Sequence, residues 1–462
     1  MAASNAFIIS QSSHAIPIKF VNEENFSAQK NAFSEFERNW LSTHNFSAKP
    51  DTSIAVPSTN GDIAFLLVGV KFPLTIWSLA HIPSHYPASV FFLETEQDSE
   101  ILEQLAIGFA LAQYQFTRYK FSDISPCRLV IEDASIIARA SAFIDAINLS
   151  RDLINTPTND MGPTELARAA RDVAQRLDAQ CRVITDNELL EQNYPAIHAV
   201  GRAATNPPCL IDMRWGNPNH PRVTLIGKGV CFDTGGLDIK PYSSMKLMKK
   251  DMGGAALMLG LFQLIVTMQL PIRLRLLIPA VENAIAGNAY RPQDILSTRK
   301  GLSVEIGSTD AEGRVILADA LFEADNESPD LMIDAATLTG AARTALGAEL
   351  PALFSTDRNE GEKLVSAGFE LHDPMWQMPL WDNYDRFVKS SIADITNSPN
   401  YAYAGAITAA LFLRRFISEK SNLWMHIDTM AWNVDSQPGR PVGGEALGLR
   451  ALYSYISSRY QK

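Results

Sequence analysis

Charged residues with the types and spacing of a catalytic site gather in three segments between Lys228 and Arg314. The first segment, residues 227–241, follows an apolar run and contains Lys228, Asp233 and Lys240 among four glycines. Glycine permits positive φ and close backbone approach, so this segment can fold tightly around a small ligand. It lacks the GxxxxGKS/T spacing of a phosphate-binding loop. Taken alone, it is explained equally well as a glycine-rich turn with solvated lysines.

Carboxylates mark the other two segments. Asp251 stands just before the uncharged stretch 252–270, where a helix N-terminus would favour an acidic cap. Residues 308–314 carry Asp310 and Glu312, whose side chains would point to the same side on extended backbone. Two carboxylates aimed at one place repel each other unless protons or cations compensate. A helix cap for Asp251 and a surface charge pair for the other two remain open when each is considered separately.

Together, the three segments place four carboxylates among Lys228, Lys240 and Arg314. Carboxylate oxygens with few histidines suit hard or borderline divalent ions such as Mn²⁺, Mg²⁺ and Zn²⁺. The histidines form no HExxH pairing, which disfavours a single-zinc protease. Four carboxylates (−4), two divalent ions (+4) and a bridging hydroxide (−1) leave a charge that the lysines and the arginine can offset. The pattern therefore predicts a two-metal centre in which a metal-bridging hydroxide attacks a polarised carbonyl.

An α/β fold is expected to position these segments. From residue 163 onward, amphipathic helices alternate with short apolar runs, which is typical of βα units on a buried, largely parallel sheet. Ligand sites in such sheets lie in the loops beyond the carboxyl ends of the strands, and the charged segments fall in those loops. The expected strands are 181–185, 223–226, 274–281 and 331–333, and the expected helices are 163–177, 253–269 and 315–324.

Two domains are expected for a chain of 462 residues. Residues 1–130 mix short strands and helices and would form a smaller N-terminal α/β domain. Residues 131–155 indicate a connecting helix, which stops before Pro157 because proline cannot continue it. Residues 156–462 would form the larger catalytic domain, with a central mixed, largely parallel sheet flanked by helices.

Composition disfavours several other classes of protein. The formal net charge of −11 makes nucleic acid unlikely as the main partner, because phosphate binding needs a basic surface. The four cysteines show no pairing motif, so neither a disulfide framework nor a cysteine zinc site is expected, as fits a cytoplasmic protein. Residues 1–20 lack the basic and long apolar regions of a secretion signal. The stretch 252–270 approaches membrane-spanning length, but its polar residues favour a helix buried in the core, and no membrane is expected.

On these residues the sequence resembles the leucyl aminopeptidase family, cytosolic aminopeptidases with two bound metal ions. The resemblance runs from residue 152 nearly to the C-terminus and is loose in the N-terminal part. Ser308 replaces the asparagine that begins the family signature NTDAEGR. The matching motifs are GKGVCFDTGGLDIKP (227–241), KKDMGGAA (249–256), STDAEGR (308–314) and AATLTG (335–340).

The resemblance implies a metal centre for two divalent ions, Mn²⁺ or Zn²⁺. Asp233 and Glu312 would be shared by both ions. Asp310 would complete one site, and Asp251 with Lys228 would complete the other.

It also implies the catalytic groups. Lys240 would hydrogen-bond the carbonyl oxygen as it becomes an oxyanion. Arg314 would hold a bicarbonate ion that acts as the general base, because a guanidinium suits a planar oxyanion.

The activity implied by the resemblance is release of N-terminal amino acids, leucine-like and others, from peptides. Met430 and Asn433 differ from the small and apolar residues expected in the substrate pocket, which bears on the preference for leucine. Family members usually assemble as hexamers, so a homohexamer is expected. The implied substrate-binding residues are Met248, Ser308, Thr337, Leu338, Gly340 and Met430.

Two rival functions are considered. A binding protein that keeps the fold without the chemistry, including a DNA-binding one, is disfavoured because all seven charged site residues are present. A two-metal phosphoesterase could use the carboxylates alone. The two lysines and the motif-level resemblance favour the peptidase.

Overall fold

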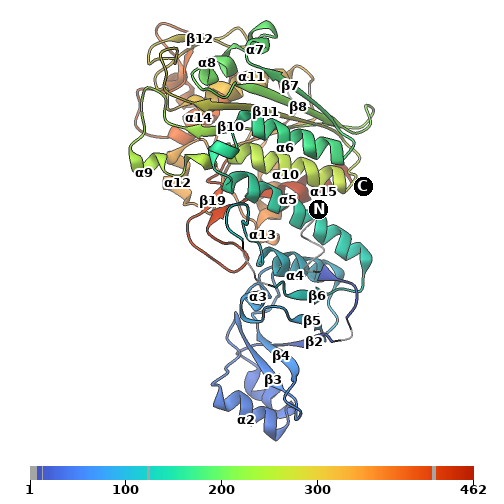
Figure 1. The fold of residues 1–462 in the computed structure, drawn as a ribbon. Coiled ribbons are helices and arrows are strands. Elements are labelled where there is room, and N and C mark those ends of the chain that lie inside the picture. The colour runs from blue at the N-terminus through green and yellow to red at the C-terminus, as the bar shows by residue number, and fades with distance from the viewer. Residues whose placement is uncertain (1–7, 13, 122–124, 419–422, 462) are drawn as a thin grey trace. The chain divides into compact units, whose positions relative to one another are not determined.

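The computed structural model describes residues 8–12, 14–121, 125–418 and 423–461 (Figure 1). The first seven residues, part of the segment tested for a secretion signal, lie outside this range. The chain divides into two compact units. The first comprises Met1–Asn148 and Asp435–Val442, and the second comprises Leu149–Val434 and Gly443–Lys462. The point of division falls within helix α5 (Ala134–Asn155), a helix expected from the sequence.

The first unit contains a six-stranded sheet in the order β1-β6-β5-β2-β4-β3 among the described residues. Its neighbouring strands are parallel except for β3 and β4, which are antiparallel. The buried side chains of its strands are apolar. The elements are β1 (Ile8–Ile9), β2 (Ile16–Val21), β3 (Thr52–Pro57), β4 (Ile63–Gly69), β5 (Val90–Leu93), β6 (Arg128–Val130), α1 (Phe26–Gln29), η2 (Lys30–Ala32), α2 (Glu35–Thr43), α3 (Ile82–His85) and α4 (Ser99–Leu111).

The second unit is built on a nine-stranded sheet in the order β16-β15-β18-β14-β9-β11-β8-β7, with β10 pairing to β11. Its centre is parallel. The antiparallel pairs are β7 with β8, β8 with β11 and β15 with β18, so the expected mixed, largely parallel sheet is confirmed. The strands are β7 (Gln180–Thr185), β8 (Cys209–Trp215), β9 (Arg222–Gly227), β10 (Gly229–Asp233), β11 (Arg273–Asn283), β14 (Leu331–Ala336), β15 (Ala352–Ser355), β16 (Trp376–Gln377) and β18 (Trp424–Asp428).

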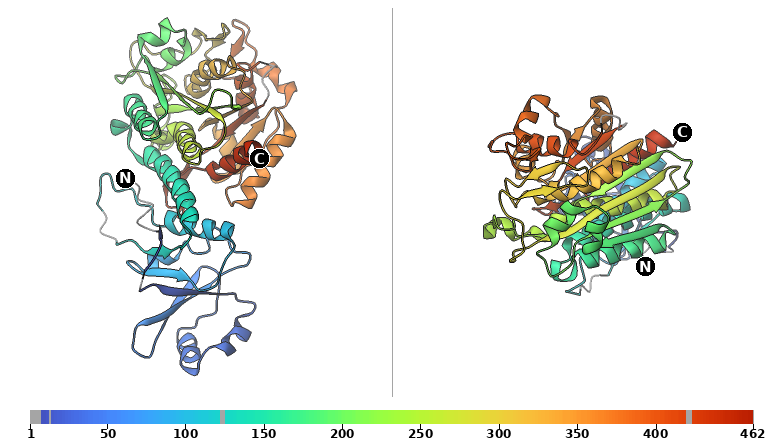
Figure 2. Two further views of the ribbon diagram at one scale, coloured as in Figure 1. Left: turned by 90° about the vertical axis from the view of Figure 1, so that its right-hand side faces the viewer. Right: turned by 90° about the horizontal axis from the view of Figure 1, so that it is seen from above.

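Helices cover both faces of this sheet (Figures 1 and 2). One face packs against α6 (Pro163–Arg176), α10 (Gly253–Thr267), α13 (Arg358–Glu370) and α15 (Leu449–Tyr460), and the other against α8 (Pro195–Gly201), α11 (Glu312–Asp325) and α14 (Gly405–Arg414). The smaller elements are η3 (Thr158–Asp160), α7 (Asn187–Glu191), α9 (Tyr242–Met245), η4 (Met248–Met252), β12 (Ile295–Ser297), β13 (Ser303–Glu305), α12 (Gly340–Leu346), η5 (Asp382–Val388), β17 (Ile395–Thr396), β19 (Trp432–Asn433) and β20 (Gly443–Gly444).

Helix α10 is apolar on all sides because it lies inside this unit. Every residue from Gly253 to Val266 is buried, between the central strands and α15. A helix that is hydrophobic all round is typical of a protein core. In the described part of the chain, no helix is both long and apolar enough to cross a membrane.

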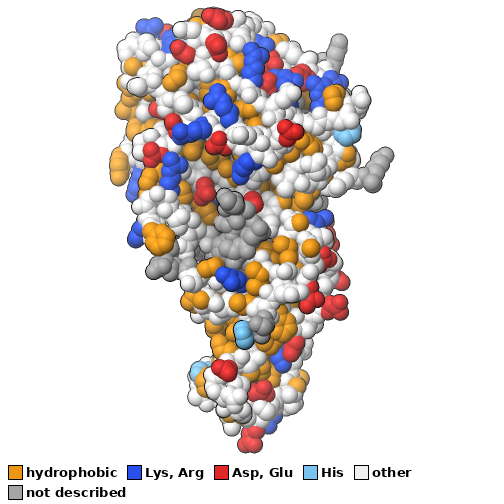
Figure 3. Space-filling view, turned by 45° about the vertical axis from the view of Figure 1, so that its right-hand side comes forward, with side chains coloured by type: hydrophobic (Ala, Val, Ile, Leu, Met, Phe, Trp, Pro, Cys, Tyr) orange, Lys and Arg blue, Asp and Glu red, His pale blue; other side chains and the backbone are white. Residues whose placement is uncertain are grey.

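The surface shown in Figure 3 carries charges of both signs. Lysine and arginine side chains are interspersed there with aspartate and glutamate side chains. This face therefore differs from the continuous basic surface that typically binds nucleic acid.

Candidate metal centre

Lys228 is the buried cation at the centre of the site. It follows the last residue of β9, and only 2% of its surface is exposed. Its Nζ lies 2.9 Å from both Asp251 Oδ2 and Glu312 Oε1, and it donates to the carbonyl of Thr337 at 3.1 Å. Burial alone would lower the pKa of Lys228, but the neighbouring carboxylates outweigh burial and raise it. The lysine is therefore a fixed positive charge that holds two strand-end loops and α11 together.

Asp233 ends strand β10 and is anchored by three kinds of donor. Its Oδ1 accepts from the Gly235 amide and from Asn283 Nδ2, both at 2.8 Å. Its Oδ2 lies 2.8 Å from Lys240 Nζ, which also forms an ion pair with Asp310. Lys228 and Lys240 are both largely buried, so the alternative of a turn with solvated lysines is wrong.

Asp310 and Glu312 meet Asp233 at the carboxyl end of the sheet. The three residues offer ligand oxygens that all lie within 4.8 Å of one another. The expectation of extended backbone is wrong here, because Asp310 lies in a turn and Glu312 is the first residue of α11. The turn, rather than strand alternation, brings the carboxylates together.

Asp251 does not cap helix α10. It lies in η4, is 3% exposed, and its Oδ1 accepts from Thr337 Oγ1 at 2.7 Å. The N-cap position belongs to Met252, whose side chain makes no cap hydrogen bond. Asp251 is outside the group of three carboxylates and is joined to it through Lys228. The helix-cap alternative is therefore wrong.

Burial and mutual repulsion disfavour the negative charges of these carboxylates, and bound cations would stabilise them. Burial, followed by the charge of Asp251, raises the pKa of Asp233 to about 6. Burial, followed by the charge of Asp233, raises the pKa of Glu312 to about 8. Asp251 Oδ2 and Glu312 Oε1 are buried and accept no hydrogen bond of good geometry, although each lies 2.9 Å from the ammonium of Lys228. Buried carboxylate oxygens whose only close partner is one shared ammonium fit hard or borderline divalent ions.

Arg314 lies in the first turn of α11 with 9% of its surface exposed. Its Nη1 donates to the carbonyl of Asn397 at 2.6 Å, whereas its buried Nε has no hydrogen-bond partner among the described residues. Burial lowers the pKa of Arg314 to about 10, so it remains cationic at neutral pH. A guanidinium with an unused donor fits a small planar anion.

The residues expected to bind substrate are distributed around the same end of the sheet. Thr337 follows β14 and contacts Asp251 directly, and Met248 is buried at the start of η4. Gly340 is exposed at the start of α12, Leu338 and Met430 are half-buried, and Ser308 Oγ accepts from the Asp310 amide at 3.1 Å.

Two asparagines that hold the loops of the site in place were not predicted from the sequence. Asn283 ends β11 in register with Asp233 and also donates to the carbonyl of Thr309. Asn397 is fully buried; its Oδ1 accepts from the amide of Gly307, and its Nδ2 donates to the carbonyl of Ser308. The role of Asn283 could have been predicted from the sequence, because this residue follows an apolar run that ends at the same edge of the sheet as Asp233. Asn397 has no such local signal.

Asp428 was also missed, although it ends strand β18 next to β14. Its carboxylate accepts from the amides of Leu338 and Thr339 at 2.9 and 3.2 Å and from the Thr339 hydroxyl at 2.5 Å. It thereby fixes the loop that contains three of the expected substrate-binding residues.

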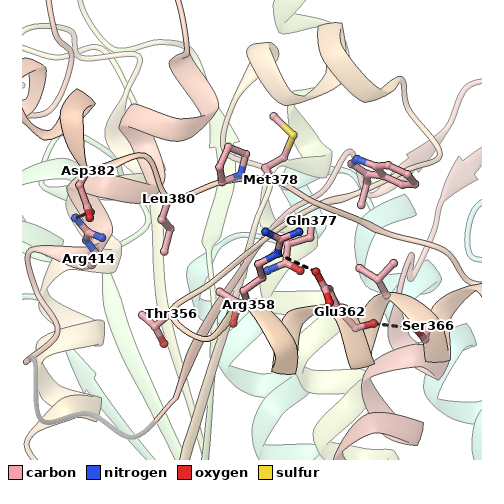
Figure 4. Close-up of a pocket in the computed structure, with 13 residues that line it drawn as sticks. Thr356, Arg358, Glu362, Ser366, Gln377, Met378, Leu380, Asp382 and Arg414 are labelled. Carbon is pink, nitrogen blue, oxygen red and sulfur yellow. Dashed lines mark hydrogen bonds and ion pairs between the residues drawn. The ribbon is translucent and has the colours of Figure 1, made fainter.

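A cavity of about 890 Å³ at the β15–β16 edge of the sheet lies apart from this site (Figure 4). None of the described residues that line it is a predicted site residue. Its arginines are already paired, Arg358 with Glu362 at 2.8 Å and Arg414 with Asp382 at 2.7 Å. The carboxylate group, rather than this cavity, has the chemistry of an active site.

A parallel-centred α/β sheet with carboxylates, lysines and an arginine near its carboxyl end fits the class of metal-dependent hydrolases. The model of the cytosol aminopeptidase family catalytic domain matches residues 148–453, and that of the M17 aminopeptidase N-terminal domain matches residues 16–132. This chain belongs to the cytosol aminopeptidase family.

Individual relatives agree with that assignment. A protein of Roseiflexus castenholzii named "Probable cytosol aminopeptidase" is 41% identical over 379 residues, which are 78% of this chain and 77% of the relative. The crystal structure of a cytosol aminopeptidase from Coxiella burnetii is 44% identical, with a TM-score of 0.95 over 98% of this chain and 99% of that one. The bottromycin maturation enzyme BotP in complex with Mn is 29% identical, with a TM-score of 0.88 over 97% of this chain and 100% of that one.

Membership of this family makes the chain a metal-dependent hydrolase that acts on the N-termini of peptides. The two-domain α/β architecture is that of the family, and the predicted fold class is confirmed.

Proposed function

We propose that the chain is a two-metal aminopeptidase whose ions, Mn²⁺ or Zn²⁺, bind at the carboxylate centre. The observation that carries this proposal is the group Asp233, Asp310 and Glu312, with ligand oxygens within 4.8 Å of one another. Asp233 and Glu312 would be shared by both ions, and Asp310 would complete one site. Asp251 would complete the other site together with Lys228, whose amine would have to give up its proton to act as a ligand. When bound, two such ions activate water and polarise a carbonyl.

Lys240 is proposed to hold the carbonyl oxygen of the scissile bond as negative charge develops on it. Burial would lower its pKa, but its ion pairs with Asp233 and Asp310 outweigh burial and raise it, so the group stays protonated. A preorganised cation in a partly closed site stabilises an oxyanion more strongly than it would in water.

Arg314 is proposed to hold bicarbonate, which would supply a general base. The unused buried Nε of Arg314 supports this role, and its Nη1 is fixed by Asn397. A rigid guanidinium can orient a planar anion without paying further conformational entropy.

The substrates would be peptides with a free α-amine, and the pocket would be formed by the loops that contain Met248, Ser308, Thr337 to Gly340, and Met430. Hydrolysis of aminoacyl amides by purified protein loaded with Mn²⁺ tests this proposal. Leucyl, methionyl and alanyl amides should be cleaved, their N-acetylated forms should not, and a chelator should abolish cleavage. Cleavage of the acetylated amides, or of no amide with any added metal, would contradict it.

We further propose a cytoplasmic homohexamer, on the family resemblance. Leu237 and Ile239 are exposed apolar residues on the loop that follows Asp233, Tyr242 is exposed at the start of α9, and the three offer surface for contacts between subunits. Sedimentation equilibrium of the purified protein should give six times the chain mass, and a monomeric mass would contradict the assembly.

A further inference from the structure

A cluster of aromatic side chains joins η5 to the segment that precedes α14. The ring of Tyr401 stacks on the ring of Phe387, with the centroids 3.9 Å apart and the planes at 9°. Tyr384, on the same helix as Phe387, lies 6.2 Å from the ring of Tyr401. Tyr403 packs edge-on against Tyr401 at 5.7 Å and ends the cluster, with 73% of its surface exposed. The cluster therefore holds in place one aromatic ring that solvent can reach.

The segment that carries Tyr401 and Tyr403 starts at the wall of the metal centre. Asn397, just before it, binds the backbone of residues 307–311 through both ends of its amide. The carbonyl of Ser398 lies so close to Gly307 that a Cβ on this glycine would overlap it. The segment is thus anchored on the loop that contains Ser308 and Asp310.

The same segment ends at the other flank of the proposed substrate pocket. Ala404 is the N-cap residue of α14 and has a φ of 56°, which a residue other than glycine keeps only where the surrounding structure fixes it. A Cβ on Gly405, the first residue of α14, would lie 3.1 Å from the Cβ of Ala341. Ala341 directly follows Gly340, one of the residues proposed to bind substrate. Residues 398–404 therefore connect the two flanks of the pocket.

Tyr403 lies close to the second of these flanks. It is two residues before Gly405, so the Cα atoms of these two residues lie within about 7 Å of each other. A peptide whose first residue is held at the metal centre must extend out of the pocket, and Tyr403 offers its ring near that exit. Aromatic pairs are favourable beyond the apolar area that they bury. Because Tyr401 already holds the ring in place, little side-chain entropy would be lost when a second ring binds.

We propose that Tyr403 binds an aromatic side chain in the part of the peptide that follows the scissile bond. Peptides with an aromatic second or third residue are then preferred substrates. This inference rests on the proposed aminopeptidase function, and it makes Tyr403 a residue that determines specificity.

Steady-state kinetics of the Mn²⁺-loaded full chain on three peptides with the same first residue test the proposal. The peptides are Leu-Gly-Gly, Leu-Phe-Gly and Leu-Gly-Phe. The wild type should have a higher kcat/KM for at least one of the phenylalanine peptides than for Leu-Gly-Gly. Tyr403→Ala should lower that ratio by about 2- to 10-fold, as expected when one aromatic pair is lost. Tyr403→Phe, which keeps the ring, should retain the ratio.

Trp376→Ala is the matched control. It removes a half-exposed aromatic side chain on the edge strand β16, where the residue lines the cavity that lies apart from the metal centre. This variant should have the same ratio as the wild type.

Equal kcat/KM for the three peptides in the wild type, or an unchanged ratio in Tyr403→Ala, would overturn this inference and leave the proposed function intact. An equal loss for all three peptides in Tyr403→Ala would also overturn it, because the residue would then support the structure rather than select the substrate. Failure of the wild type to cleave any of the peptides or leucyl amide would instead overturn the proposed function.

Discussion

The side chain of Lys228 lies so close to Gly313 that a Cβ on this glycine would be 2.4 Å from Lys228 Cε. The lysine cannot move aside freely, because its Nζ contacts Asp251, Glu312 and Thr337. The second residue of α11 must therefore be glycine for the buried lysine to reach both carboxylates.

Gly313→Ala is expected to displace Lys228 while preserving the fold. The variant should retain the far-ultraviolet circular dichroism of the wild type and lose affinity for Mn²⁺, since the positions of Asp251 and Glu312 depend on the lysine. Calorimetric titration with Mn²⁺ measures this effect. Gly287→Ala is the matched control, because a Cβ at Gly287 would have no atom within 4 Å. Equal Mn²⁺ affinity in the two variants would show that Lys228 does not organise the site.

Asp310→Ala and Lys240→Met should separate metal binding from catalysis. Asp310→Ala removes a proposed ligand and should reduce both metal content and rate. Lys240→Met should keep its metal and lose kcat by about 10²- to 10³-fold, the loss typical of removing one oxyanion donor. Metal analysis of the dialysed proteins, together with kcat for leucyl amide, distinguishes the two effects. A Lys240→Met variant with wild-type kcat would show that another group holds the oxyanion.

Asn397→Ala should loosen the loop that carries Asp310. Asn397 is fully buried and uses both ends of its amide on residues 307–311. Leaving these backbone groups without partners should lower the free energy of unfolding by about 2–3 kcal/mol. Chemical denaturation measures this change, and the variant should also bind Mn²⁺ more weakly. Asn219→Ala, at an exposed loop position, is the control and should not change stability. The bracing role would be refuted by an Asn397→Ala protein as stable as this control.

His81 should make the first unit sensitive to acid. It is 6% exposed, and burial lowers its pKa from 6.5 to about 4, against an opposing effect of Asp51. Below pH 6.5 the unfolded chain takes up a proton that the folded chain does not, so stability falls as the pH drops from 6.5 to 4. Above pH 6.5 the group is neutral in both states and contributes nothing to the pH dependence. The loss at pH 4 is about 3 kcal/mol.

Thermal unfolding between pH 7 and 4.5 measures this effect. His81→Leu should flatten the decline in stability relative to the wild type, whereas His14→Leu, at an exposed position of the same unit, should not. Parallel curves for His81→Leu and the wild type would remove His81 as the cause.

Much of the fold follows from local patterns. The apolar run 274–281 corresponds to β11, and the uncharged stretch after Asp251 corresponds to the buried helix α10. These elements could be predicted because apolar periodicity and strand ends are local features. The carboxylates could be predicted as a group because they lie in motifs that also contain glycines, lysines and an arginine, and Asp233 directly ends a strand of the parallel part of the sheet.

The backbone around Asp310 and Glu312 could not be predicted in this way. The turn is held by contacts with distant parts of the chain: the Thr309 amide donates to Asp238, and Asn397 binds residues on both sides of Asp310. Helix α11 begins at Glu312 rather than at 315, and an acidic residue is favourable in the first turn of a helix. Such long-range hydrogen bonds leave no periodic signal in the sequence.

Metal reconstitution tests the two-metal centre most directly. Protein stripped with a chelator should be inactive on leucyl amide, and titration with Mn²⁺ should restore activity that saturates at two equivalents per chain, as the proposed ligand set requires. Asp310→Ala should bind fewer equivalents under the same conditions. Activity that survives the chelator, or full activity at one equivalent with no further binding, would contradict the two-metal centre.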